Sequence, residues 1–136
     1  MKIINTIVIA VLAFAMLMLG SAASLSQGSC AGKSEHTIQV RPGPDDVPVL
    51  TYQGGSAEDV HVCIGDTIKW VLNGPDRQYF VDFLEGAPFA GEKRRGSSGN
   101  MISVTVGGPA ERGSSYKYDV EFEDGGTLDP RIIVDR

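Results

Sequence analysis

The chain has 136 residues, with 17 acidic and 12 basic side chains and a formal net charge of −5. This length supports one domain around one hydrophobic core. The acidic balance disfavours nucleic acid and anionic lipid as partners, because both carry negative charge, and it favours solubility.

The first 23 residues have the pattern of an export signal. Lys2 gives a positive start, residues 7–19 form an uncharged apolar run, and Ser21-Ala22-Ala23 supplies small residues at the cleavage position. The run is shorter than the roughly 20 residues that span a bilayer, which favours cleavage over a stable membrane anchor. We therefore expect a periplasmic or secreted protein. The expected divisions are a cleaved signal peptide (1–23), an N-terminal linker (24–35) and one folded domain (36–136).

Short β-rich runs follow the linker, and clusters of Gly, Pro, Asp, Asn and Ser separate them. This punctuation, without a sustained helical period, is typical of a β-sandwich or barrel. The expected strands lie at residues 36–40, 48–52, 60–64, 67–72, 78–84 and 100–106, with two more joined by a hairpin loop within residues 116–135.

Three local features of these runs matter for the fold. Gly65-Asp66 predicts a two-residue hairpin or tight bend in which the glycine takes a positive φ. Trp70 lies mid-strand in an apolar run and is expected in the core. Residues 85–99 are predicted to form a long connection, and the basic run Lys93-Arg94-Arg95 inside it is interpreted as solvated loop.

Two segments resemble the cupredoxin family. The segment VCIGDTIKWVLNG (62–74) is similar to its V-x-x-G-D-T-V-x-W-x-N pattern, and GSSYKYDVEFEDGGTLDPRIIV (113–134) resembles its C-terminal hairpin. The resemblance covers roughly residues 36–136. It implies an all-β, Greek-key β-sandwich of seven or eight strands.

The resemblance does not extend to the blue-copper ligands of that family, which are two His, a Cys thiolate and usually a Met. Gln78 or Tyr79 stands where the first His is expected, and Val120 or Phe122 stands near the Cys position. The loop EDGGTLD (123–129) contains no His, Cys or Met. The resemblance thus implies a cupredoxin-like domain without a type 1 copper site, and no cofactor is expected. Gly125-Gly126 is interpreted as a hairpin closure with unusual backbone dihedrals.

The soft and imidazole ligands outside the signal are Cys30, Cys63, His36, His61 and Met101. The alternative function is therefore copper binding or electron transfer through noncanonical ligands, with His36 and His61 on neighbouring strands. That alternative predicts the two imidazole rings within about 4 Å of each other.

The two cysteines form an even pair in an exported chain, so a Cys30–Cys63 disulfide is the default interpretation. Lipidation of Cys30 is the alternative, and the polar Gln27 argues against it because a lipobox resembles Leu at that position.

Catalytic motifs are lacking in this sequence. It has no G-x-S-x-G nucleophile elbow, and its paired carboxylates lie in polar turns, so we do not expect an enzyme. Binding of an as yet unknown protein or small ligand is assigned instead to Tyr52, Tyr79 and the loop tip Pro88-Phe89, since long loops on a rigid sandwich often carry function. The competing interpretation is that Phe89 plugs the end of the sandwich.

Overall fold

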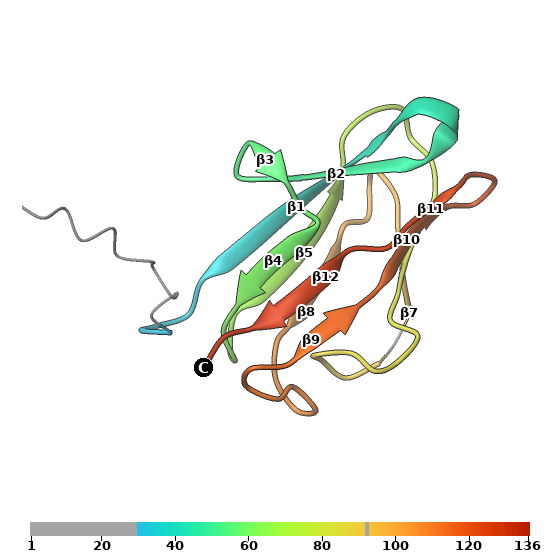
Figure 1. Ribbon diagram of the computed structural model, residues 1–136. Coiled ribbons are helices and arrows are strands. Elements are labelled where there is room, and N and C mark those ends of the chain that lie inside the picture. Colours follow the sequence, from blue (N-terminus) through green and yellow to red (C-terminus); the bar gives the residue numbers. More distant parts are fainter. Residues whose placement is uncertain (1–29, 92) are drawn as a thin grey trace, which may run out of the picture.

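The computed structural model describes residues 30–91 and 93–136 (Figure 1). The predicted signal peptide (1–23) and the beginning of the predicted linker lie outside these residues. Within the described ranges the protein is an all-β sandwich, as predicted, with one short 3₁₀ turn. None of its helical segments is long or apolar enough to cross a membrane.

Twelve strands form within the described part of the chain. Their bounds are β1 (Glu35–Pro42), β2 (Pro48–Tyr52), β3 (Gly55–Ser56), β4 (Asp59–Val62), β5 (Thr67–Leu72), β6 (Tyr79–Asp82), β7 (Lys93–Gly96), β8 (Ile102–Thr105), β9 (Ser115–Lys117), β10 (Asp119–Phe122), β11 (Thr127–Leu128) and β12 (Arg131–Val134), with η1 at Pro44–Asp46. The strand orders in the three sheets are β3-β2-β1-β5-β8, β11-β10-β6-β7 and β4-β12-β9. Figure 1 shows β1 and β5 side by side, as their parallel register requires.

The alternation of apolar and polar residues places one face of each long strand in the core. In β5 the buried residues are Ile68, Trp70 and Leu72, and their neighbours are partly exposed. Trp70 is fully buried, and its ring lies edge-on to Tyr118 at a centroid distance of 5.6 Å. Tyr118 in turn stacks on Phe83 at 4.8 Å. The predicted core role of Trp70 is therefore confirmed.

The strand expected from Tyr116 onward is divided between two sheets. β9 pairs with β12, and β10 pairs with β6. Tyr118 lies between them, and its backbone amide donates to the carbonyl of Pro130 at 3.0 Å. The strand thus switches sheets here, and only its first part pairs with the final strand.

The Gly65-Asp66 step is a bend and not a hairpin. β4 pairs with β12, and β5 lies between β1 and β8, so the bend carries the chain from one sheet to another. Gly65 has φ +97°, a conformation that glycine adopts without steric cost. The bend is tied to the residue that follows β8, because the amide of Gly65 donates to the carbonyl of Val106 at 2.8 Å.

The predicted 85–99 loop contains a strand. β7 pairs antiparallel with β6, with Phe80 opposite Arg95. The guanidinium of Arg95 lies 5.3 Å from the centroid of the Phe80 ring. The interpretation of this basic run as solvated loop is wrong, because long basic side chains on a sheet can cover an aromatic ring while their charges face water.

Candidate functional site

Three loops meet at one end of the sandwich. They are the 43–47 turn after β1, the 73–78 segment after β5 and the turn after β10, and Figure 1 shows the first and last of these beside each other. Gly126 donates its amide hydrogen to the carbonyl of Asp46 at 3.2 Å. A Cβ atom on Gly125 would lie 2.5 Å from that carbonyl oxygen. Gly125 and Gly126 are not among the positive-φ residues of the described chain, so glycine is needed here for close approach and not for unusual dihedrals.

An arginine fills this end of the sandwich. The two terminal nitrogens of Arg77 donate to both carboxylate oxygens of Asp46, at 2.5 and 2.7 Å. Its guanidinium carbon lies 3.9 Å from the centroid of the Phe122 ring. The hydrogen bonds from Arg77 hold the pKa of the Asp46 carboxyl below its ordinary value. A bidentate pair of this kind fixes orientation as well as charge.

The positions that correspond to two copper ligands in the resemblance carry aromatic residues that pack in the core. Tyr79 and Phe122 are opposite each other in the register of β6 and β10. Tyr79 is fully buried, and its hydroxyl donates to the backbone carbonyl of Trp70 at 2.6 Å. Type 1 copper requires imidazole nitrogen and thiolate sulfur, whereas these residues offer a phenol, a phenyl ring and a guanidinium cation. They do not fit that metal.

The structure does not bring His36 and His61 together. His36 lies on β1 and faces inward, and both of its ring nitrogens are hydrogen-bonded, to Tyr52 and to Asp66. His61 lies on β4 in a different sheet, is exposed, and places Nδ1 2.8 Å from a carboxylate oxygen of Asp135. In the two described ranges, no three His, Cys, Asp or Glu side chains are grouped so as to hold a metal ion.

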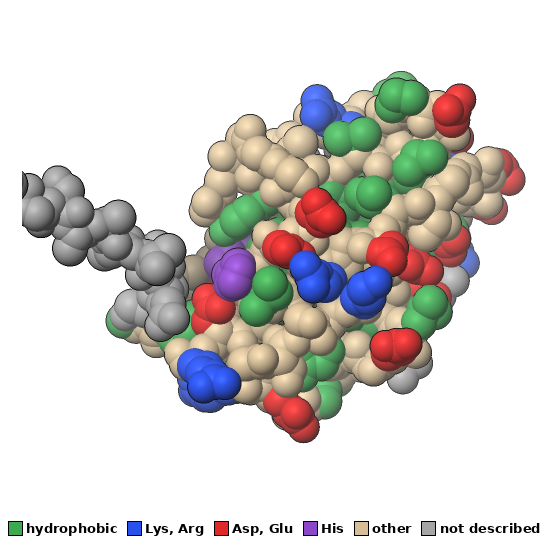
Figure 2. All heavy atoms as spheres, in the orientation of Figure 1, with side chains coloured by type: hydrophobic (Ala, Val, Ile, Leu, Met, Phe, Trp, Pro, Cys, Tyr) green, Lys and Arg blue, Asp and Glu red, His purple; other side chains and the backbone are tan. Residues whose placement is uncertain are grey.

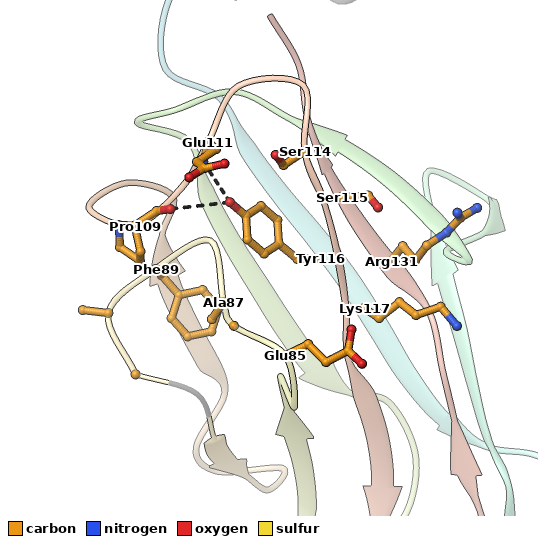
Figure 3. A pocket seen from close by; sticks show the side chains of 13 residues that line it. Glu85, Ala87, Phe89, Pro109, Glu111, Ser114, Ser115, Tyr116, Lys117 and Arg131 are labelled. Carbon is orange, nitrogen blue, oxygen red and sulfur yellow. Dashed lines mark hydrogen bonds between the residues drawn. The ribbon is translucent and has the colours of Figure 1, made fainter.

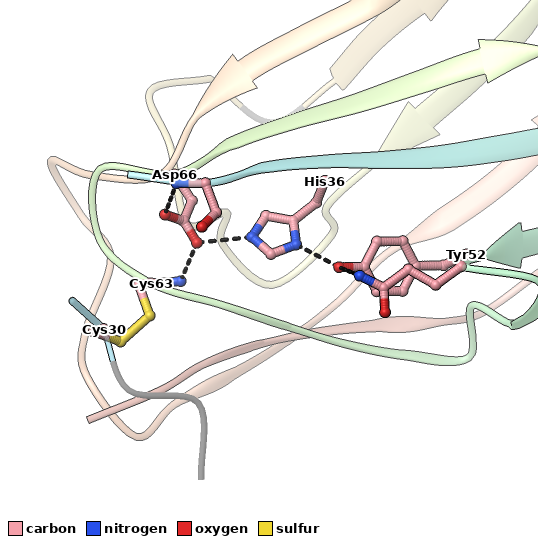
Figure 4. A network of polar contacts seen from close by, with 7 residues as sticks. Cys30, His36, Tyr52, Cys63 and Asp66 are labelled. Carbon is pink, nitrogen blue, oxygen red and sulfur yellow. Dashed lines mark hydrogen bonds and ion pairs between the residues drawn. A yellow bond between two sulfur atoms is a disulfide. The ribbon is translucent and has the colours of Figure 1, made fainter. Parts of the chain in front are cut away.

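The Cys30–Cys63 disulfide is formed, as predicted, with a Cα–Cα distance of 5.5 Å (Figure 4). It ties the segment before β1 to the end of β4. The sulfur atom of Cys30 that lipidation would use is therefore already bonded.

Replacing both cysteines by serine is expected to lower the free energy of unfolding by about 3 kcal/mol, because the crosslink closes a long loop in the unfolded chain. Urea denaturation of the double variant beside the oxidised wild type measures this loss. Equal midpoints for the two proteins would contradict the prediction.

A buried carboxylate organises the same region. Asp66 is 2% exposed and accepts hydrogen bonds from the amide of Ser34, the amide of Cys63 and Nε2 of His36, at 2.8, 2.8 and 2.7 Å. Figure 4 shows these bonds converging on it. Burial raises the pKa of Asp66, but the two amide bonds and the His36 contact outweigh burial and lower it. Sequence reasoning placed Asp66 in a bend and missed this role, which depends on residues distant in sequence.

The predicted partner surface is largely buried. Tyr79 and Pro88 are buried, and Phe89 is only 3% exposed, with its ring 5.1 Å from Phe83 in an edge-to-face contact. The prediction that Phe89 is an exposed anchor is wrong, and the interpretation that it plugs the sandwich is correct. Tyr52 is half-buried, and its hydroxyl is bonded to His36. An apolar ring next to a sandwich end gains more from burial than from solvent exposure.

The concave surface lies at the opposite end of the sandwich from Arg77. A groove of about 650 Å³ runs between the 85–91 loop and the segment that leads into β9 (Figure 3). The Tyr116 ring lies inside it, and the Tyr116 hydroxyl accepts from the amide of Glu111 at 2.8 Å. The other lining side chains that carry polar groups are Glu85, Glu111, Ser114, Ser115, Lys117 and Arg131.

The two cations of the groove are already paired with carboxylates. Lys117 lies 3.2 Å from Asp129, and Arg131 forms two hydrogen bonds with Asp59, at 2.9 and 3.0 Å. Figure 2 shows acidic and basic side chains interspersed on this face of the molecule. Sequence reasoning selected the 85–99 segment but missed Tyr116, whose spacing matched the core residues of the same strand.

No protein-family model matches the chain, and no curated protein matches it. Its structure resembles the laccase-like multicopper oxidase CueO from the lignin-degrading bacterium Ochrobactrum sp., with a TM-score of 0.52 and 15% identity over 81% of this chain and 33% of that one. A heme-copper terminal oxidase gives 0.49 and 15% over 77% and 66% of the two chains. An amicyanin in its reduced Cu(I) form gives 0.45 and 19% over 73% and 82%.

At such identities a structural likeness establishes the fold and leaves the chemistry to the site residues. This chain spans about a third of the length of the laccase-like oxidase. The likeness agrees with the sandwich, the G-D-T-I-K-W segment and the C-terminal strands described above. The protein has a cupredoxin-like fold.

Proposed function

We propose that the protein is an exported, non-catalytic cupredoxin-like module that binds a protein or small ligand or has a structural role, and that it lacks a type 1 copper site. The observation that carries this proposal is the Arg77–Asp46 ion pair seated on Phe122. A cupric ion placed at this end would meet a fixed positive charge and no soft ligand. The apolar and aromatic contacts there serve packing instead.

The export part of the proposal is supported by the signal pattern of residues 1–23 and by the disulfide, since disulfides persist in oxidising compartments. The binding part is supported by the groove around Tyr116, which combines a fixed aromatic ring with hydroxyl and charged groups. Ligand sites are typically concave surfaces of this mixed character. The non-catalytic part is supported by the Asp66–His36 pair, which ends on a tyrosine and not on a serine or cysteine nucleophile.

Copper content tests the proposal. Protein purified from the exported fraction of cells supplied with copper is expected to contain far less than one copper per chain and to show no intense blue absorption. The matched variant is His61→Ala, because His61 is the exposed imidazole.

One copper per chain with an intense blue band would contradict the absence of a type 1 site. Colourless copper at one per chain that disappears in His61→Ala would instead support the alternative, copper binding through noncanonical ligands.

A further inference from the structure

Tyr52 and His36 form a directed hydrogen bond. Asp66 accepts two backbone amide bonds and is held ionised, so it only accepts hydrogen bonds. His36 must therefore donate from Nε2 to Asp66 at 2.7 Å. Neutral His36 then has a lone pair on Nδ1, and the Tyr52 hydroxyl donates to it at 2.7 Å. Gln53 completes the chain by donating from Nε2 to the Tyr52 oxygen at 3.0 Å.

The other three tyrosines of the chain lack such a base. The Tyr79 hydroxyl donates to a backbone carbonyl, and the Tyr118 hydroxyl accepts from the indole nitrogen of Trp70. The Tyr116 hydroxyl contacts backbone groups of the neighbouring turn. A backbone carbonyl cannot take up a proton near neutral pH, whereas a neutral imidazole can. Tyr52 is thus distinguished by its proton acceptor.

We propose that Tyr52 is a one-electron donor site for small soluble oxidants, and that its phenolic proton passes to His36 during the oxidation. The oxidant gains one electron and is reduced. The O–H bond of Tyr52 breaks, a new N–H bond forms at Nδ1 of His36, and the products are a neutral tyrosyl radical and an imidazolium. A one-electron reductant reverses the step, returning the electron and the proton to Tyr52.

The arrangement suits this step for two physical reasons. Loss of an electron makes a phenol strongly acidic, and a base within hydrogen-bond distance lets the proton leave together with the electron. The positive charge that develops on His36 lies 2.7 Å from the Asp66 carboxylate, which is 2% exposed and therefore little screened. Tyr52 itself is half-buried and its neighbour Gln53 is exposed, so a small oxidant can approach the hydroxyl.

The test compares two tyrosine variants of the full exported protein. Stopped-flow mixing with hexachloroiridate(IV) gives the oxidation rate, and freeze-quenched electron paramagnetic resonance identifies a tyrosyl radical. We expect Tyr52→Phe to react roughly tenfold more slowly, the factor that one hydrogen bond to a developing charge represents. Tyr116→Phe, which removes another half-buried tyrosine with only backbone partners, is expected to react at the wild-type rate. Equal rates for wild type and Tyr52→Phe would overturn the proposal.

A second variant tests the role of His36. His36→Gln keeps a group that accepts the Tyr52 hydrogen bond but cannot hold its proton. We expect oxidation roughly tenfold slower than in the wild type, with circular dichroism confirming the fold. Wild-type oxidation is also expected to be slower in D₂O, because a proton moves in the same step. A wild-type rate in a folded His36→Gln variant, or equal wild-type rates in H₂O and D₂O, would overturn the assignment of His36.

Discussion

Replacing Asp66 by alanine is expected to lower the free energy of unfolding by about 3–5 kcal/mol. The carboxylate is buried, and its loss leaves the amides of Ser34 and Cys63 and the ring of His36 without their acceptor. Unpaired buried donors are costly because water cannot replace the lost partner. Thermal and urea denaturation of the variant measure the loss.

The matched control is Asp135→Ala. Asp135 also pairs with a histidine, at 2.8 Å, but the His61 side chain is 59% exposed. An exposed pair is worth about 1 kcal/mol or less, so this variant is expected to be nearly as stable as the wild type. Equal losses in the two variants would contradict the special role of the buried pair.

The contribution of Asp66 also has a defined pH dependence. Its pKa is lowered from 3.8 in the folded protein, because the amide bonds and His36 outweigh burial. A group with a depressed pKa contributes stability above the unfolded value and loses it as the pH falls through the folded value. The difference in stability between wild type and Asp66→Ala is therefore expected to shrink below pH 3.8. A difference that stays constant to lower pH would contradict the lowered pKa.

Replacing Trp70 by alanine is expected to cost about 3–5 kcal/mol of unfolding free energy, the usual cost of deleting a large buried ring. The side chain is fully buried between strands, contacts the Tyr118 and Phe83 rings, and donates from Nε1 to the Tyr118 hydroxyl at 3.3 Å. Urea denaturation measures the effect.

Trp70→Phe is the matched control, because it keeps an aromatic ring and removes the indole N–H. It is expected to cost about 1–2 kcal/mol, from the lost hydrogen bond and a smaller ring. A loss under 1 kcal/mol in Trp70→Ala would mean that the aromatic cluster around Tyr118 does not form the main core.

The sequence predicted the strands well where burial has a period of two. The apolar residues of β1 and β5 alternate with polar ones, and each of these strands has one buried face. β7 was missed because a Lys-Arg-Arg run looks like solvated loop until a neighbouring aromatic ring covers it. The switch of sheets at Tyr118 was missed because alternation reports which face is buried and not which strand is the partner.

The candidate site was less predictable for a related reason. The absence of copper ligands followed from residue types alone, since the 123–129 loop has no His, Cys or Met. The presence of Arg77 on Phe122, and of Asp66 beside His36, depends on contacts between residues about 30 or more positions apart. Phe89 illustrates the same limit, because an apolar residue in a long loop can cover the sandwich or project from it. Only the tertiary structure shows which.

Anomalous diffraction at the copper absorption edge, from crystals grown with Cu(II), tests the central claim most directly. Our account predicts that Arg77 stays on Asp46 and that the end of the sandwich bounded by Tyr79, Phe122 and the 43–47 turn gives no copper peak. A copper peak at that end, with side-chain atoms of these loops coordinating it, would contradict the account.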